Sequence, residues 1–374
     1  MASVFLTGGD KLKKIVFITI SLGFGGAEKM LTYVANQLTL RGHSCSIINI
    51  NSADNYVNVK QQKLEKSIKI YSLKQTHSKN KNFHRILQIY KIVKDIKADI
   101  ILGFTVYPNM YAKIVGTMLG VPSLMSERAD PYRTADHSIK DKIMMLLINT
   151  SKGGVFQTDG AMKFYTKGLR KRGKIIPNPI FINDELPKVD FLAREKTVVS
   201  VGRLDNEQKR YDVMLKAFQI FSKKHPEYIL KLYGKGSDEE LIETWVKELK
   251  IIDKVKFMGL SLQPMKDISK DGMFIITSDY EGISNALLEA MAVGLPCVST
   301  DHTPGGARLL IKDHENGLLA PIGDVENLAK CLCEYAENPE LAKKCGENAE
   351  KVVETYEPQK IIDMWEEYIL KCCK

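Results

Sequence analysis

Two glutamates lie in a segment whose residue types and spacing suit the binding of a sugar and a phosphate. The segment covers residues 278–292, with Glu281 and Glu289 eight positions apart. It follows an apolar run, 273–277, that is typical of a buried parallel strand. Gly294-Leu295-Pro296 comes after it and indicates the end of a helix.

Helix geometry predicts how these two carboxylates are placed. With Glu281 at the helix N-terminus, Glu289 lies a little over two turns further on and roughly on the same side. Backbone N–H groups around Ile283, Ser284 and Asn285 then point out of the helix start, where the dipole favours an anion. Carboxylates for sugar hydroxyls beside a phosphate-binding helix start predict a nucleotide-sugar site.

Positive charge for a diphosphate is expected from a loop earlier in the same half of the chain. Gly202 ends a predicted strand, and Arg203 and Lys209 follow it. A guanidinium supplies a planar pair of donors and an ammonium supplies a mobile point charge, and both stabilise charge on a leaving phosphate. Because Arg210 directly follows Lys209, the residues alone leave open which of the two cations reaches the phosphate.

Glycines at other strand ends would allow a ligand to approach the backbone. Gly25 and Gly26 lie between the first predicted strand and helix. The pattern lacks the third glycine and the acidic residue of a dinucleotide fingerprint, which argues against NAD binding. Gly234 fits either a nucleotide contact or a plain turn, and Gly305-Gly306 fits either a phosphate nest or the start of a helix.

The ordered set of these fragments resembles the retaining glycosyltransferases of family 4. The resemblance covers nearly the whole chain, because the family keeps its own motifs in the same order. The shared fragments are Gly25-Gly26-Ala27-Glu28, Gly202-Arg203-Leu204 with Lys209, Gly234-Lys235-Gly236, the Glu281–Glu289 pair and Asn316-Gly317-Leu318-Leu319. The segment 126–131, Ser-Glu-Arg-Ala-Asp-Pro, is similar to a branch that builds bacterial exopolysaccharide and capsule repeat units.

The resemblance implies the α/β fold called GT-B, in which two Rossmann-like domains face each other across a cleft. It implies an N-terminal acceptor domain at 1–180, a C-terminal nucleotide-sugar domain at 181–355, and a last helix at 356–374 that crosses back to the N-terminal domain. Glu281, Arg203 and Lys209 would be the catalytic residues. The residues expected to bind the donor are Glu289, Gly25, Gly26, Gly202, Gly234, Gly282, Ile283, Ser284 and Asn285.

The acceptor side is expected at Glu127 and Arg128, which end a predicted strand of the N-terminal half. Arg128 stands where the family often has a histidine, and His137 is the nearest imidazole. Retention in the family is thought to use front-face attack, with the donor phosphate taking the acceptor proton, so no protein base is required. No Asp-x-Asp motif is present. We therefore expect no metal and no cofactor beyond the UDP-sugar substrate.

Alternating β-branched runs and longer helical stretches predict two parallel sheets built from βαβ units. A break at Pro177-Asn178-Pro179 and an extended stretch to Leu192 predict the linker between them. Strands are expected at 14–20, 44–49, 100–104, 123–126, 154–157 and 174–176, with a short one near 68–71, and then at 197–201, 228–233, 255–258, 273–277 and 297–299. Helices are expected at 28–41, 83–97, 108–119, 139–149, 159–171 and 357–370.

Charge divides unevenly between the halves. Residues 1–185 hold 28 Lys and Arg against 13 Asp and Glu, or +15, while residues 186–374 hold 26 against 32, or −6. No nucleic-acid-binding signature is present. The excess favours an anionic membrane surface or a lipid diphosphate acceptor, with a solvated lysine-rich surface as the alternative explanation.

The compartment is expected to be reducing. Seven cysteines are scattered without metal-ligand spacing, and no apolar run approaches the roughly 20 residues of a membrane span. The expected protein is peripheral on the cytoplasmic face of the cell membrane. It would transfer a hexose or N-acetylhexosamine from a UDP-sugar to a lipid-linked or polysaccharide acceptor. A nucleotide-sugar epimerase, a phosphorylase or a non-catalytic nucleotide-binding protein are the alternatives.

Overall fold

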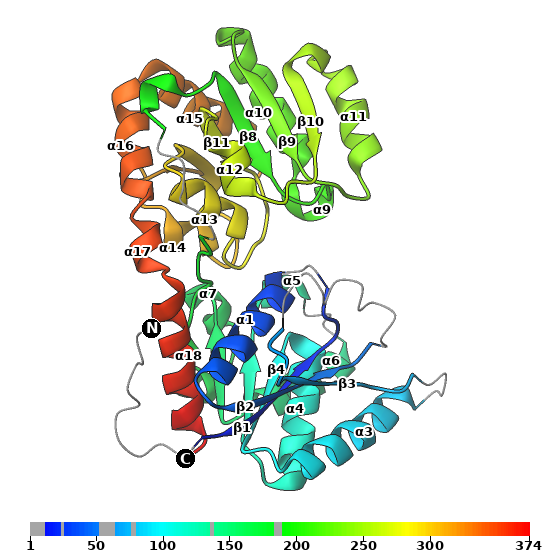
Figure 1. Cartoon of the computed structure of the whole chain (residues 1–374). Coiled ribbons are helices and arrows are strands. Elements are labelled where there is room, and N and C mark those ends of the chain that lie inside the picture. Colours follow the sequence, from blue (N-terminus) through cyan, green and yellow to red (C-terminus); the bar gives the residue numbers. More distant parts are fainter. Residues whose placement is uncertain (1–11, 24–25, 52–63, 76–79, 135–137, 183–188) are drawn as a thin grey trace. The chain divides into compact units, whose positions relative to one another are not determined.

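The computed structural model describes residues 12–23, 26–51, 64–75, 80–134, 138–182 and 189–374. The chain forms two compact units (Figure 1). Unit 1 comprises Met1–Pro177 with Gln359–Lys374, and unit 2 comprises Asn178–Pro358. The boundaries expected from the sequence lay after residues 180 and 355.

Unit 1 contains a parallel sheet in the order β3-β2-β1-β4-β5-β6-β7. Its strands are β1 (Lys14–Thr19), β2 (Ser44–Asn49), β3 (Lys69–Ser72), β4 (Ile100–Phe104), β5 (Ser123–Ser126), β6 (Gly153–Phe156) and β7 (Lys174–Ile175). The central strands β1 and β4 are mostly apolar and buried because helices cover both faces of the sheet. Chain order reverses between β1 and β4, which is the switch point where such sheets bind ligands.

Helices of unit 1 sort onto the two faces by the alternation of strand side chains. The helices are α1 (Gly26–Leu40), α3 (Lys81–Ile96), α4 (Val106–Leu119), α5 (Pro131–Thr134), α6 (Ile139–Asn149), α7 (Asp159–Lys163), α8 (Lys167–Arg172) and α18 (Pro358–Cys372). Ile15 and Phe17 of β1 pack with α1 and α18, whereas Val16 and Ile18 pack with α3 and α4. The single helix expected at 159–171 is two helices, because the Thr166 hydroxyl caps α8.

The last helix, α18, is part of the core of unit 1. Trp365 is fully buried and stacks on Phe104 of β4, with ring centroids 5.8 Å apart. The Tyr368 hydroxyl accepts a hydrogen bond of 3.0 Å from the Gly154 N–H. Arg41, at the end of α1, forms ion pairs with Asp363 and Glu366. Apolar burial and these polar contacts together hold α18 against the sheet.

Unit 2 contains a second parallel sheet, in the order β10-β9-β8-β11-β12-β13. Its strands are β8 (Thr197–Val201), β9 (Ile229–Tyr233), β10 (Val255–Gly259), β11 (Met273–Ile276), β12 (Cys297–Thr300) and β13 (Leu318–Ala320). The short strand β13 was not expected from the sequence. Both units therefore have the Rossmann-like α/β architecture that the alternating pattern predicted.

Two helical layers cover the sheet of unit 2. The helices are α9 (Asn206–Lys209), α10 (Tyr211–Lys224), α11 (Glu239–Glu248), α12 (Pro264–Ile268), α13 (Asn285–Ala292), α14 (Gly306–Leu310), α15 (Val325–Glu337), α16 (Pro339–Ala349) and α17 (Val352–Thr355). Ile275 faces the core that contains α10 and α15, and Phe274 faces the core that contains α13. The first residues of unit 2 lie beside its last ones, since the Ile180 N–H donates to the Tyr356 carbonyl at 2.9 Å.

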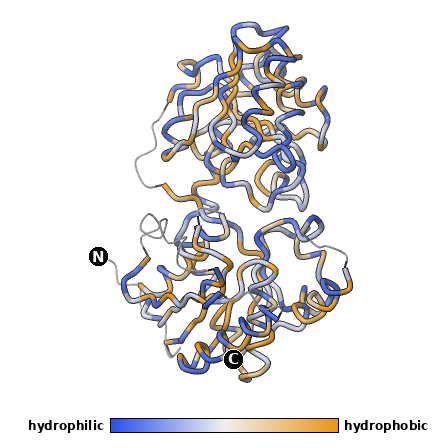
Figure 2. Tube along the Cα trace, turned by 90° about the vertical axis from the view of Figure 1, so that its right-hand side faces the viewer, coloured by the Kyte–Doolittle hydropathy of each residue, from blue (hydrophilic) through white to orange (hydrophobic). Residues whose placement is uncertain are grey.

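Polar and apolar segments alternate along the described parts of the trace (Figure 2). Within the described ranges, none of the helices combines the length and apolarity that a membrane span requires.

Candidate functional site

Three loops of unit 2 meet at the carboxyl-terminal edge of its sheet. They follow β8, β11 and β12, which are adjacent strands of one parallel sheet. The carboxyl ends of such strands open at the same edge, so side chains far apart in the sequence converge there. Most of the residues expected to bind the donor lie in or beside these loops.

Lys209 and Glu281 form a mostly enclosed ion pair at this edge. The Lys209 Nζ donates to Glu281 Oε1, and the two side chains are 14% and 12% exposed. The Ser278 hydroxyl donates to the same carboxylate oxygen at 3.0 Å. Burial tends to raise the pKa of Glu281, but the positive charge of Lys209 and the hydrogen bonds from Lys209 and Ser278 lower it below its usual value. Glu281 is therefore an anion at neutral pH.

Backbone contacts fix the position of Lys209 relative to the loop after β11. The Thr277 hydroxyl donates to the Lys209 carbonyl at 2.8 Å. The Asp279 N–H donates to the Gln208 carbonyl at 3.0 Å, and the Gln208 amide donates to the Tyr280 carbonyl at the same distance. The loop carrying the cation and the loop carrying the carboxylate are therefore held together by direct hydrogen bonds.

The expectation that Glu281 opens a helix is wrong. Helix α13 starts at Asn285, with the Ser284 hydroxyl as its N-cap. Tyr280 pairs with Thr303 in a parallel bridge, and the Glu281 N–H donates to the Thr303 carbonyl at 2.8 Å. Because this bridge holds the backbone extended, Glu281 lies in a loop and only Glu289 lies on the helix. The two carboxylates do not share a helix face.

The loop after β8 separates the roles of its cations. Arg203 is 70% exposed and contacts Gln208 and Asp205, at 3.0 and 3.7 Å. The Arg210 guanidinium donates hydrogen bonds of 2.9–3.1 Å to the carboxylates of Asp212 and Asp279. The Arg210 backbone φ of 54° is left-handed, at the junction where α9 ends and α10 begins. Arg210 therefore braces the loops, and Lys209 is the cation beside Glu281.

Glu289 and Asn285 lie on α13, most of whose other side chains are buried. Glu289 is half-buried on this helix. The Asn285 Oδ1 accepts a 3.0 Å hydrogen bond from Asn178 at the start of unit 2. Ile283 is 5% exposed and packs in the core, so only its backbone is available to a ligand.

Close backbone contacts explain why glycines occupy two of these loops. A Cβ on Gly234 would lie 1.8 Å from the Gly202 carbonyl oxygen, and the φ of Gly234 is +146°. A Cβ on Gly306 would lie 1.7 Å from the Gly282 carbonyl oxygen. The loops after β8 and β9, and those after β11 and β12, therefore pack at distances that any side chain would prevent.

His302 is a residue of this site that the sequence reasoning missed. It is fully buried, and within the described chain neither ring nitrogen has a hydrogen-bond partner. Burial lowers its pKa despite the neighbouring Glu281 carboxylate, so the ring is neutral at pH 7. Its position after β12, at the same sheet edge as Glu281, is the signal that could have identified it.

In unit 1, Glu127 and Arg128 make internal contacts. Glu127 is 1% exposed, and its oxygens accept from the Arg128 and Ala129 N–H groups and, at 2.6 Å, from the Tyr165 hydroxyl. Burial raises the pKa of Glu127, and these bonds only partly offset the effect. The guanidinium of Arg128 lies 5.0 Å from the Trp365 ring centroid. Burial lowers the pKa of Arg128 to about 9. An acceptor role for both residues stays a prediction.

The glycine turn after β1 is only partly described. Gly25 and also His137 lie outside the described residues, as do positions 183–188 of the expected linker. Gly26 is exposed at the first position of α1. The Ser21 hydroxyl donates to Glu28 at 3.1 Å, which ties the end of this first strand segment to the first turn of the helix.

Two family models match the chain. The model described as "Glycosyl transferases group 1" matches residues 182–352, and "Glycosyl transferase 4-like" matches residues 25–151. An uncharacterized glycosyltransferase of Haemophilus influenzae is 28% identical over 359 residues, 95% of this chain and 99% of the relative. A Campylobacter jejuni enzyme is 28% identical over 364 residues, 95% of this chain and 97% of its own. It is named GalNAc-alpha-(1->4)-GalNAc-alpha-(1->3)-diNAcBac-PP-undecaprenol alpha-1,4-N-acetyl-D-galactosaminyltransferase.

Solved structures share this fold over nearly the whole chain. HepE of Anabaena, in complex with UDP and glucose, matches with a TM-score of 0.80 at 17% identity, covering 96% of this chain and 99% of HepE. A mutant of TarM from S. aureus, in complex with fondaparinux, alpha-GlcNAc-glycerol and UDP, matches with a TM-score of 0.75 at 15% identity. That match covers 96% of this chain and 99% of TarM.

Proposed function

Because this chain is a glycosyltransferase of the GT-B fold, we propose that it transfers a hexose or N-acetylhexosamine from a UDP-sugar, with retention, to a lipid-linked or polysaccharide acceptor. The observation that carries this proposal is the Lys209–Glu281 pair at the loop edge of unit 2. A cation and a carboxylate held side by side could bind the phosphates and the sugar hydroxyls of a sugar diphosphate, respectively.

The proposed roles follow from burial and charge. Lys209 has three N–H donors, of which Glu281 occupies one, so a phosphate oxygen can take another. Arg203 is exposed and able to reach an incoming diphosphate. Both cations would stabilise charge on the leaving phosphate. Glu281 is an anion and not a proton donor, so it would accept hydrogen bonds from the donor sugar, while Glu289 would accept from the ribose.

Retention at this site would not require a protein base. In front-face attack the donor phosphate takes the proton of the acceptor hydroxyl. That proposal agrees with the state of Glu281, which is paired with Lys209, and of Glu127, whose two oxygens are occupied within unit 1. No divalent metal enters the proposed step, since Lys209 and Arg203 supply the positive charge.

The proposed acceptor class rests on the names of related enzymes. The C. jejuni relative is named for a substrate carried on diphospho-undecaprenol, and a second C. jejuni relative, 24% identical over 373 residues, is also named for a diphospho-undecaprenol substrate. Their matches span 95% and 94% of this chain. We infer a place in surface glycan synthesis, with membership of the exopolysaccharide branch of family 4.

A screen of radiolabelled UDP-sugars tests the donor and the division of roles. The purified protein is incubated with each UDP-hexose and UDP-N-acetylhexosamine and a lipid diphosphate acceptor, and label in the lipid phase is counted. Glu281→Gln should nearly abolish transfer while leaving UDP affinity within a few-fold. Glu289→Gln should mainly weaken UDP binding.

Glu243→Gln, an exposed change on α11, is the matched control and should behave as wild type. Loss of UDP affinity with turnover retained in Glu281→Gln would contradict the assigned roles. Absence of transfer from every UDP-sugar would contradict the proposed donor. Inversion at the anomeric carbon, read by NMR of the product, would contradict retention.

We further propose that unit 1 docks on an anionic membrane surface through α6. Ile139, Ile143 and Leu146 are 78%, 55% and 67% exposed, and their spacing places them on one face of the helix. At 100° per residue, Lys140 and Lys142 flank this stripe on its two sides. The apolar stripe would insert among the acyl chains, and the bordering lysines would contact the anionic headgroups above them. The +15 charge of residues 1–185 favours the same anionic surface.

Vesicle sedimentation tests the docking. Binding to phosphatidylglycerol vesicles should exceed binding to phosphatidylcholine vesicles and should weaken as salt rises. Ile143→Ser with Leu146→Ser should reduce it several-fold, as should Lys140→Gln with Lys142→Gln. Leu192→Ser, in unit 2 and at a residue that is 84% exposed, is the control. Unchanged sedimentation of the α6 variants would rule the proposal out.

A further inference from the structure

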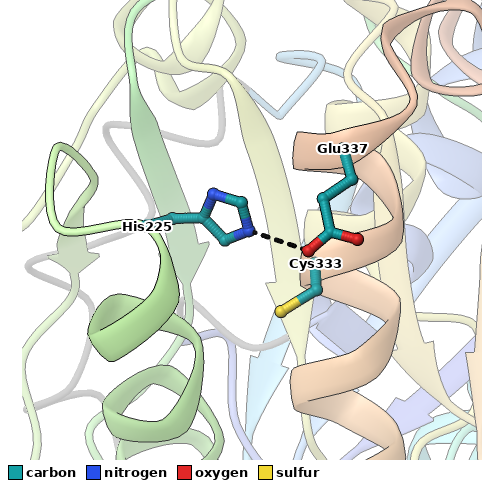
Figure 3. A group of neighbouring side chains, drawn as sticks. All are labelled: His225, Cys333 and Glu337. Carbon is teal, nitrogen blue, oxygen red and sulfur yellow. Dashed lines mark hydrogen bonds and ion pairs between the residues drawn. The ribbon is translucent and has the colours of Figure 1, made fainter.

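Three side chains of different chemistry converge at the edge of unit 2 opposite the candidate site. Figure 3 shows the His225 ring, the Cys333 sulfur and the Glu337 carboxylate pointing toward one another. One potential ligand atom from each lies within 4.8 Å of the other two. Among the residues that the structure describes, this is the one cluster of three or more His, Cys, Asp or Glu side chains whose ligand atoms are close enough to hold a metal ion.

The position of the group follows from the topology. Helix α10 leaves the carboxyl end of β8 and returns to the start of β9, so His225, its C-cap, lies at the amino-terminal edge of the sheet. Helix α15 follows β13 and presents Cys333 and Glu337 one turn apart near its end. No local spacing in the sequence indicates the group, because His225 and Glu337 are 112 residues apart.

The distances suit a tetrahedral ion after small side-chain movements. Ligand bonds of about 2.0–2.3 Å to zinc place neighbouring donor atoms roughly 3.5 Å apart. His225 Nε2 and Glu337 Oε1 are already 3.3 Å apart. Cys333 is 6% exposed and fixed in the core, whereas the Glu337 side chain is 59% exposed and free to adjust.

The imidazole is held in the orientation that a ligand needs. Phe221 stacks on the ring with centroids 5.1 Å apart, and Tyr228 packs edge-on at 6.2 Å. The other ring nitrogen, Nδ1, lies 3.9 Å from the Glu227 carboxylate. A carboxylate hydrogen-bonded to the other nitrogen commonly orients a metal-binding histidine, and rotation of the exposed Glu227 side chain would bring it from 3.9 Å into hydrogen-bond range.

We propose that His225, Cys333 and Glu337 bind one zinc-class divalent ion, with water as the fourth ligand. A thiolate, an imidazole and a carboxylate form a donor set that suits zinc and excludes magnesium and calcium, which prefer oxygen ligands alone. Binding releases the thiol proton of Cys333 to solvent and forms the sulfur–metal bond. The ion joins the end of α10 to α15 and therefore stabilises unit 2 without taking part in sugar transfer.

Cobalt substitution tests the site directly, because a thiolate bound to Co²⁺ gives a charge-transfer absorption in the near ultraviolet. The purified full-length protein is stripped with a chelator and titrated with Co²⁺, and Zn²⁺ then displaces the cobalt. We expect one equivalent of cobalt with the thiolate band. Cys333→Ser should abolish the band, and Cys331→Ser, two residues earlier on the same helix, should retain it.

Glu337→Gln covers the case in which loss of Cys333 disturbs folding, since its side chain faces solvent. It should weaken zinc binding at least about tenfold, measured by competition with a colorimetric chelator. At the same zinc concentration, the unfolding midpoint should rise less in Glu337→Gln than in the wild type. A missing band in the wild type, a band retained in Cys333→Ser or lost in Cys331→Ser, or unchanged affinity in Glu337→Gln would each overturn the proposal.

Discussion

Removal of the Lys209 charge should destabilise unit 2 by an amount that depends on pH. In Lys209→Met the Glu281 carboxyl keeps its enclosed position and loses its cation. Ionised, it would cost about 3–5 kcal/mol as an unpaired buried charge. It escapes that cost by taking up a proton, and the penalty then equals the free energy of protonating a carboxyl that is ionised in the unfolded chain.

The magnitude follows from an unfolded pKa of about 4.3 for glutamate. At pH 7 the pH lies about 2.7 pH units above this pKa, and at about 1.4 kcal/mol per pH unit protonation costs roughly 3.7 kcal/mol. At pH 5 it costs about 1 kcal/mol. In the wild type the folded pKa of Glu281 is lowered. Its contribution is therefore present above the unfolded pKa and is lost only as pH falls through the folded value. Lys209→Met should consequently lose about 2.7 kcal/mol more at pH 7 than at pH 5.

Urea unfolding measures this difference, because the two tryptophans divide between the units. Trp245 lies in unit 2 and Trp365 in unit 1, so a Trp365→Phe background reports unit 2 alone. The extrapolated free energies of Lys209→Met and its parent are compared at both pH values. In the double variant Lys209→Met, Glu281→Gln the pH dependence should disappear. An equal loss at pH 5 and pH 7, or no loss at all, would refute the reasoning.

Three further changes test separate features. Arg203→Ala removes an exposed side chain, so it should leave the unfolding midpoint unchanged and slow transfer by about 100-fold, and an unchanged rate would remove it from the proposed chemistry. Gly306→Ala places a Cβ 1.7 Å from the Gly282 oxygen and should cost about 1–3 kcal/mol by thermal unfolding, whereas Gly168→Ala, with no atom nearer than 3.5 Å, should be neutral. Trp365→Ala should cost unit 1 about 3–5 kcal/mol in urea unfolding, and a loss below about 1 kcal/mol would show that its burial contributes little.

The fold was predictable because its signals are local. Apolar strands alternating with amphipathic helices indicate a parallel sheet wherever they occur, and α6 has the bounds 139–149 that the sequence predicted. Strand β13 was not predicted because its three residues, Leu318–Ala320, are too few to show a periodic pattern. The break between α7 and α8 was not predicted because it depends on the Thr166 side chain, whose hydroxyl caps α8 and also donates a hydrogen bond to Asn149.

The arrangement of the site was predictable only in part. The residues converge on one sheet edge, which follows from strand ends, but Glu281 is held in a loop by pairing with a segment some twenty residues further on. No local pattern encodes that pairing. The distinction between Lys209 and Arg210 likewise depends on a left-handed residue and on Asp279, which adjacent positions in a sequence do not reveal.

The position of α18 has a consequence for biosynthesis. Unit 1 buries Trp365 and Tyr368, which the ribosome adds only after all of unit 2. The first part of unit 1 is therefore synthesised without the helix α18 that completes its hydrophobic core. Unit 2 can fold before α18 is synthesised. A fragment that ends at Pro177 would leave Phe104 and Arg128 uncovered and should aggregate, whereas one in which a short tether joins Pro177 to residues 358–374 should remain monodisperse.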